Sequence, residues 1–138
     1  MSQAAVDLLN DYHRFDDGWL LSFEYFFPEG AEPLSAQVVL YAYNDAENEW
    51  GKVKIVVEDV QELCAKVSGN FISPINLGVK LLKFGDLWCL DINGNYALCK
   101  DPASLDEVRQ DGYCYIIGKS VTAHIIEKSQ AISRDGKA

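Results

Sequence analysis

The densest group of side chains that could do acid–base chemistry lies near the N-terminus, in the stretch HRFDDGW at residues 13–19. His13 could serve as a general base there, with Asp16 or Asp17 orienting its ring. His13 and Asp17 are, however, only four residues apart in an expected turn, and no Ser or Cys nucleophile lies nearby in sequence. Asp and Gly are ordinary turn residues. The sequence therefore favours a structural turn over a catalytic site, and we assign no catalytic residue.

The other histidine, His124, lies in the run TAHII at residues 122–126. It alternates there with Ala123 and Ile125, as strand residues do when successive side chains point to opposite faces. We interpret His124 as a strand histidine rather than as a ligand or a base.

A second polar group is acidic and occupies the stretch NDAENEWG at residues 44–51. The spacing of its carboxylates resembles part of a calcium loop, but the glycine and the distal glutamate of an EF-hand are missing, so a solvated turn is favoured. Trp50 beside them either packs back onto the core or is offered to a partner, because binding surfaces are enriched in Trp and Tyr. The candidate binding residues are Asp45, Glu47, Glu49 and Trp50.

Several well-known local motifs are missing from the sequence, including the phosphate-binding and dinucleotide-binding glycine patterns, HExxH and GxSxG. The four cysteines form no C-x-x-C pair, so we predict no metal site and no cofactor. We expect reduced, mostly buried thiols. A Cys89–Cys99 disulfide stays open as an alternative, because a three-residue turn would place these two cysteines opposite each other and a two-residue turn would not. The cysteines are Cys64, Cys89, Cys99 and Cys114.

The net charge of −9 is unevenly distributed along the 138 residues. Residues 1–62 contain 13 acidic and 3 basic residues, whereas residues 63–138 contain 8 and 9. An acidic half can steer a basic protein towards it, although it also serves simple solubility. Without a Lys/Arg patch we expect no nucleic-acid binding, and without an apolar run of about 18–20 residues we expect no membrane span. The N-terminus lacks a secretory signal, which favours a cytoplasmic location.

Apolar periodicity predicts the elements that position these groups. Residues 2–12 have helical spacing, and residues 19–27 form a strand. Residues 36–60 form a hairpin around the acidic turn, with a first strand that is apolar on both faces. Two capping-box spacings, Asp59 with Glu62 and Ser104 with Glu107, predict short helices. These helices cover Val60–Val67 and Leu105–Gln110.

Further strands follow the hairpin. The turns Gly85-Asp86 and Asn93-Gly94 predict a three-stranded meander, and Pro74 before it suggests an edge or crossing segment. The last strand is interrupted at Gly118-Lys119 by a bulge or a tight turn. The expected strands are Asn76–Phe84, Leu87–Ile92, Asn95–Lys100 and Tyr113–Glu127.

Together these elements predict a β-dominated α+β fold. It consists of a curved antiparallel sheet or open barrel of about seven to eight strands, with two or three short helices. We expect one globular domain over residues 1–128 and a flexible polar tail over residues 129–138.

The order of features also resembles small bacterial immunity-protein-like domains that are found beside polymorphic toxins. Phe15-Asp16-Asp17-Gly18 stands where such domains open with a Phe-His-Asp step into a strand. Val57-Glu58-Asp59-Val60 matches the hydrophobic–acidic–Val step that precedes their short helix. The resemblance covers residues 15–60 and departs at Asp16, where a histidine is expected. It implies a non-enzymatic protein that binds and neutralises a toxin, and it carries over no individual functional residue.

Two functions remain open from the sequence. The favoured one is a protein-binding module, of the immunity type, that meets a basic protein through the acidic turn and Trp50. The alternative is a small-ligand-binding or modest hydrolytic domain with a pocket in the curved sheet and His13 or His124 on the pocket wall. The aromatic residues that would line this pocket are Trp19, Phe23, Tyr25, Tyr41 and Tyr43.

Overall fold

The fold is an open six-stranded antiparallel sheet with two helices, described in a computed structural model. The structure describes residues 2–12, 15, 17–28, 30, 32–44, 47–66, 75, 77–94, 96 and 100–130, with only the backbone at residues 129 and 130. Among these residues the sheet has six strands, fewer than the seven or eight predicted, in the order β1-β2-β3-β6-β5-β4. The elements are α1 (Ser2–Asp11), β1 (Trp19–Phe26), β2 (Ser35–Asn44), β3 (Glu49–Ala65), β4 (Val79–Phe84), β5 (Leu87–Ile92), α2 (Leu105–Asp111) and β6 (Cys114–Gln130).

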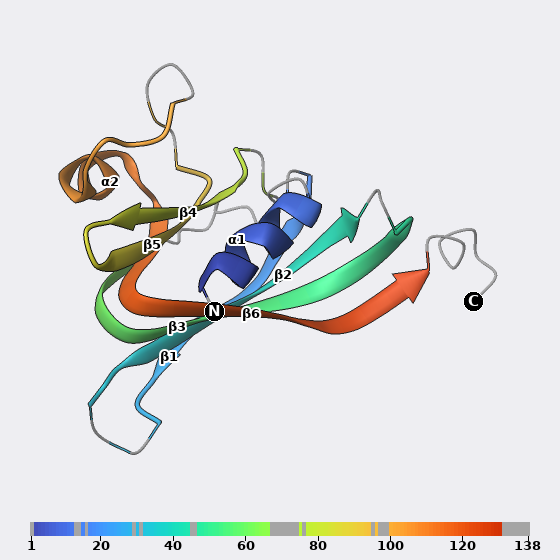
Figure 1. Ribbon diagram of the computed structural model, residues 1–138, viewed down its shortest axis with the longest axis horizontal. Helices are drawn as coiled ribbons and strands as arrows, with labels where there is room; N and C mark the ends of the chain where they lie inside the picture. The colour runs from blue at the N-terminus through green and yellow to red at the C-terminus, as the bar shows by residue number, and fades with distance from the viewer. Residues whose placement is uncertain are drawn as a thin grey trace.

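Two long strands form the centre of the sheet. β3 and β6 have 17 residues each and pair with one another along their length. On its other side β3 pairs with β2 only over residues 49–57, and β6 pairs with β5 only over residues 114–118. Figure 1 shows the two strands running through the molecule, with β4, β5 and α2 gathered at one end. We call this the β4–β5 end, and we call the opposite side, formed by β1 and β2, the β1–β2 end.

The main core lies between α1 and one face of the sheet, which we call the inner face. Ala5, Leu9 and Tyr12 repeat at helical spacing and are buried, as the sequence predicted for this helix. In β2 the even-numbered residues from Ala36 to Ala42 are fully buried, and the odd-numbered residues from Gln37 to Tyr43 are half-buried. β2 is therefore interior within the sheet, as expected, but only its inner face is fully covered.

The second helix covers the opposite face at the β4–β5 end. Val108 of α2 packs with Cys89 and Ile117 in a smaller core. The predicted cap is confirmed, because the Ser104 hydroxyl oxygen accepts a hydrogen bond of 3.3 Å from the backbone N–H of Glu107. β5 and the first part of β6 are thus packed on both faces.

The predicted helix Val60–Val67 is wrong, because β3 continues through Ala65. Asp59 has a left-handed φ of +53°, and the register shifts between Val60 and Glu62. This bulge lets the rest of β3 pair with Cys114–Ile117 of β6, and that long-range pairing outweighs the local capping signal.

The predicted meander also needs correction. β5 pairs with β4 on one side and with β6 on the other, so it cannot be the middle strand of a meander whose third strand is Asn95–Lys100. The turn Gly85-Asp86 is confirmed as the β4–β5 connection. Residues 95 and 97–99, including Cys99, lie outside the described residues, as does Pro74.

Gly118 lies inside β6 and pairs with Val60 of β3, where the register of the two strands shifts. β6 is one continuous strand here, so the alternative of a turn between two short strands is wrong. A Cβ atom on Gly118 would lie 2.5 Å from Val57 Cγ1 and 2.9 Å from the Glu58 carbonyl oxygen. The glycine therefore permits the close approach of the two long strands.

Candidate functional site

The acidic turn between β2 and β3 separates its candidate binding residues onto two faces of the sheet. Asp45 lies outside the described residues. Glu49 lies opposite Asn44 on the inner face, and Trp50 lies opposite Tyr43 on the outer face. Because Glu49 and Trp50 are consecutive strand residues, their side chains point to opposite sides. The sequence predicted that both residues lie in one turn, whereas β3 already begins at Glu49.

On the inner side, the turn, α1 and β6 enclose a small polar cavity of about 210 Å³. Glu47 and Glu49 line it, and Lys128 Nζ lies 3.5 Å from a carboxylate oxygen of Glu49. The Asn44 side-chain oxygen accepts a 3.2 Å hydrogen bond from the backbone N–H of Glu47 and fixes the turn. The lining residues are Leu8, Asp11, Tyr12, Asn44, Glu47, Glu49, Ile125 and Lys128.

Tyr12 links this cavity to the core. Burial raises the pKa of its hydroxyl, although a hydrogen bond with Asn44 and the charge of Lys128 act in the other direction. A Cβ atom on Gly51 would lie 2.8 Å from this hydroxyl oxygen, so a glycine makes room for it. Tyr12 therefore holds the turn against α1 and remains neutral at physiological pH.

On the outer face, four aromatic side chains form what we call the outer aromatic cluster. Trp50 stacks on Tyr41 with ring centroids 5.0 Å apart, and it meets Tyr43 edge-on at 5.5 Å. Trp19 of β1 lies opposite Tyr41 across the β1–β2 pair. Trp50 and both tyrosines are half-buried, so they pack against one another and still present ring surface.

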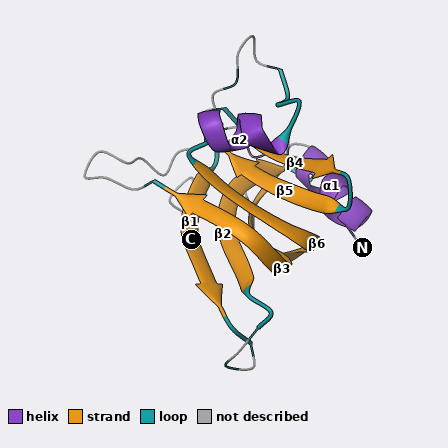
Figure 2. Cartoon of the chain, turned by 90° about the vertical axis from the view of Figure 1, so that its left-hand side faces the viewer, coloured by secondary structure: helices purple, strands orange, loops and turns teal. Residues whose placement is uncertain are grey.

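Large apolar side chains are exposed along β1, which pairs only with β2 among the described residues. Figure 2 places α1 to the right of the strands and α2 above them, so neither helix lies on the left, where β1 is drawn. The exposure of this strip was not predicted from the sequence, although a run as apolar as WLLSFEYFF was the available signal. The exposed fractions are 43% for Trp19, 49% for Leu21, 62% for Tyr25, 37% for Phe26 and 47% for Phe27.

The polar cluster predicted near the N-terminus is only partly described, because His13 and Asp16 lie outside the described residues. Asp17 is exposed in a turn, and its backbone N–H donates a 2.9 Å hydrogen bond to the carbonyl of Ile75. His124 is an exposed residue of β6 and lies opposite Lys54 of β3. The expectation that His124 is a strand residue is confirmed.

The aromatic residues proposed to line a pocket in the sheet do not share one face. Trp19 and Tyr41 lie on the outer face, whereas Phe23 lies opposite Val38 and Tyr25 opposite Ala36, on the inner face. The β-bulge at Leu21 changes the alternation between these residues of β1.

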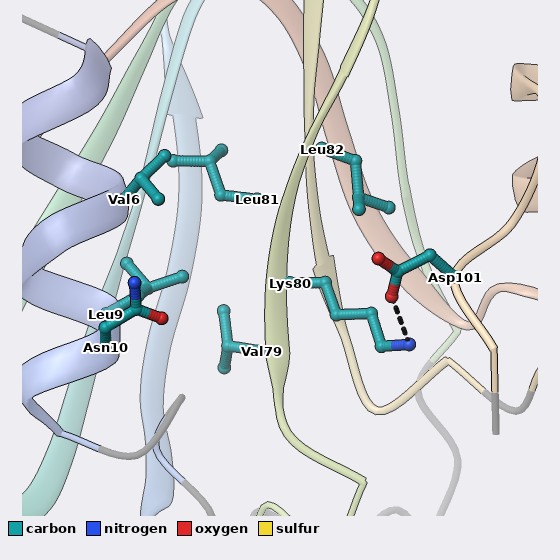
Figure 3. Close-up of a pocket in the computed structure, with 8 residues that line it drawn as sticks. All are labelled: Val6, Leu9, Asn10, Val79, Lys80, Leu81, Leu82 and Asp101. Carbon is teal, nitrogen blue, oxygen red and sulfur yellow. Dashed lines mark hydrogen bonds and ion pairs between the residues drawn. The ribbon is translucent and has the colours of Figure 1, made fainter.

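A second cavity of about 130 Å³ lies between α1 and β4. Figure 3 shows Val79 and Leu81 pointing towards α1, and Lys80 pointing away and pairing with Asp101 at 2.8 Å. Apart from this ion pair and Asn10, the lining is aliphatic. The cavity offers few groups that could orient a ligand.

A buried carboxylate lies at the β4–β5 end and was not singled out from the sequence. Asp91 is fully buried, accepts a 2.7 Å hydrogen bond from the Tyr96 hydroxyl and a 3.2 Å bond from the Gly94 backbone N–H. Burial raises the pKa of Asp91 despite these donors. The signal was present as an acidic residue within the apolar run LWCLDI. Because both carboxylate oxygens of Asp91 accept hydrogen bonds from residues that follow β5, we interpret Asp91 as a structural residue.

Cys89 and Cys114 are also buried at this end, whereas Cys64 is half-buried. Cys64, Cys89 and Cys114 are free thiols. Burial raises the pKa of both Cys89 and Cys114 to about 12, so neither is a nucleophile at neutral pH.

Within the described part of the chain, no three His, Cys, Asp or Glu side chains are arranged to hold a metal ion. No helix among those residues has the length and apolar character to cross a membrane. Comparisons with known protein families, with curated proteins and with solved structures find no match to this chain.

Proposed function

We propose that this chain is a non-enzymatic protein-binding module, of the immunity type, that binds a basic protein through its β1–β2 end. The observation that carries the proposal is the strip of five exposed large apolar side chains on β1 and Phe27, next to the outer aromatic cluster. These side chains lie on both faces of the sheet around the β1 edge, with Trp19 on the outer face and Tyr25 on the inner face. Large apolar side chains exposed together in this way are typical of interaction sites. Trp and Tyr in particular are enriched at the centres of protein interfaces.

The charge around the strip supports a basic partner. Between Phe15 and Gly51 the sequence contains eight acidic residues and no Lys or Arg. This stretch supplies both strands of the β1–β2 end and the turns beside them. Such a field attracts a positively charged surface and accelerates encounter with it. The resemblance to immunity-protein-like domains would make this partner a toxin.

The two cavities described above give less support to the alternative of a small-ligand-binding or hydrolytic domain. Pockets for drug-sized ligands have volumes of roughly 300–1,000 Å³. The cavity beside the acidic turn measures about 210 Å³, and the one beside α1 about 130 Å³. An exposed strip along a strand fits a protein surface better than it fits a small molecule.

Charge reversal at two places tests the proposal. The first variant combines Glu24→Lys with Glu32→Lys beside β1, and the second reverses Asp45, Glu47 and Glu49 in the acidic turn. The immobilised chain is incubated with lysate of the native host, and captured proteins are quantified by mass spectrometry. We expect the wild-type chain to retain a basic protein, and the β1 variant to retain at least about tenfold less of it.

The turn variant shows whether the acidic turn belongs to the same surface. We expect a smaller loss from it, because Glu49 faces the inner side and pairs with Lys128. A matched control, Asp86→Lys with Asp106→Lys, places the same charges at the β4–β5 end. Equal capture by all three variants would contradict the proposal, and so would retention of acidic proteins alone.

A further inference from the structure

Among the described residues β1 pairs with β2 alone, so it has one open edge there as well as exposed side chains. From Ser22 to Phe26 its register with β2 is regular over five consecutive residues, from Ser22 opposite Val39 to Phe26 opposite Ser35. Alternate backbone N–H and C=O groups of a strand point away from its single neighbour. This segment therefore offers a short row of hydrogen-bonding groups that no other described strand pairs with.

The usual protections of an edge strand are weak here. Natural sheets shield their edges with Lys or Pro, with bulges, or with covering segments. β1 contains neither Lys nor Pro, and its bulge at Leu21 lies before the regular segment. Tyr25 and Phe26 point to opposite faces of the edge and are both exposed. A strand that paired here would find apolar side chains on both faces.

Charge distinguishes between the possible occupants of this edge. Asp17 and Glu32 are exposed before and after β1, and the Glu24 side chain, which accepts a hydrogen bond from Gln37, is exposed within it. A second copy paired through β1 would bring two such acidic stretches together with no Lys or Arg from either. Repulsion therefore disfavours self-pairing, whereas basic side chains in a partner strand would be attracted.

We propose that the edge Ser22–Phe26 binds its partner by strand addition, accepting an extended segment that alternates basic and apolar residues. Main-chain hydrogen bonds to β1 supply affinity, and the flanking carboxylates with Tyr25 and Phe26 supply selectivity. This binding mode rests on the proposed function, because it specifies how the β1–β2 end would hold a basic protein.

The test uses a fluorescent, end-capped octapeptide of alternating Lys and Val as the probe, with binding followed by anisotropy. We expect saturable binding that weakens with added salt. N-methylation of its four central residues keeps side chains and charge but removes backbone pairing, and it should weaken binding at least about tenfold. Replacing Lys by Glu in the probe should abolish binding.

Two exposed tyrosines provide matched variants of the protein. Tyr25→Lys places a positive charge on the β1 edge, and Tyr113→Lys places it on a tyrosine of similar exposure, 47%, before β6. We expect Tyr25→Lys to lose probe binding by about tenfold or more and Tyr113→Lys to change it by less than about twofold. Hydrogen exchange should show protection of residues 22–26 only when the unmethylated probe is present.

Each contrary outcome has a definite meaning. Equal affinity for the N-methylated probe, or no binding of the unmethylated one, would overturn strand addition. If Glu24→Lys with Glu32→Lys still abolishes capture of a basic host protein, the proposed function survives and only the binding mode fails. A dimer of the wild-type chain in analytical ultracentrifugation that Tyr25→Lys dissociates would make a second copy the occupant and overturn the proposal.

Discussion

β1 and β5 are both strongly apolar strands, yet they have opposite surroundings. β5 has a strand on each edge and a packed core on each face, and its last four residues are fully buried. β1 pairs only with β2 among the described residues, and six of its eight residues are exposed. Apolar composition alone therefore does not determine burial. The apolar side chains of β5 are buried and stabilise the fold, whereas those of β1 remain on the surface, where we propose that a partner binds.

The sharpest test of this difference is one substitution made at both ends. Leu90→Ala in β5 should lower the free energy of unfolding by about 2–5 kcal/mol, because it removes a fully buried side chain from the main core. Urea unfolding followed by tryptophan fluorescence measures the change. Leu21→Ala in β1, where the leucine is exposed, is the control and should cost no more than about 0.5 kcal/mol. Equal losses would contradict the comparison.

Gly118→Ala tests the close contact between β6 and β3, the two strands that connect the two ends. The added Cβ would lie too close to Val57 and to the Glu58 carbonyl, so the paired strands must shift apart. We expect a loss of about 1–3 kcal/mol in the free energy of unfolding. Lys119→Ala, at the adjacent exposed position, should leave stability nearly unchanged. If both variants unfold at the same urea concentration, the close approach is not needed for stability.

Ser104→Ala tests how much α2 stabilises the β4–β5 end. Loss of the hydroxyl that accepts from the Glu107 N–H should cost about 1 kcal/mol. Thermal unfolding measures the effect, and Ser104→Asp, which retains a capping acceptor, should recover most of it. An unchanged melting temperature in Ser104→Ala would mean that α2 contributes little to folding.

The smallest stability effect is expected at the exposed strip. Tyr25→Ala should change the free energy of unfolding by no more than about 0.5 kcal/mol, because the side chain is mostly in solvent. The same variant should weaken capture of the basic partner. A large loss of stability without any loss of capture would reverse the roles assigned to the two ends.

Local patterns were sufficient to predict α1, α2, β1 and the β2–β3 hairpin. The helical repeat of Ala5, Leu9 and Tyr12 and the cap at Ser104 depend only on neighbouring residues. The second half of β3 could not be predicted this way. Its Asp59–Glu62 spacing is typical of a helix start, but pairing with a strand more than 50 residues later determines the conformation. Local propensity is a weak prior when such pairing is available.

The candidate site likewise combines features that depend on neighbouring residues with features that depend on long-range strand pairing. Glu49 and Trp50 were predicted to share one binding turn, but their separation onto two faces follows from where β3 begins. The exposure of β1 depends on its place at the end of the strand order, which no local pattern encodes. The buried Asp91 was visible only as an acidic residue in an apolar strand, and its partner Tyr96 follows five residues later.

Because β3 and β6 pass through both ends of the molecule, the two ends are thermodynamically linked. Any segment that pairs with β1 in the folded state alone raises the free energy of unfolding of the whole sheet. Trp88, in β5 at the far end, can then report occupancy of β1 through a higher melting temperature. The reverse holds once destabilisation beneath α2 leaves part of the chain unfolded, because only the folded fraction offers the β1 edge to a partner.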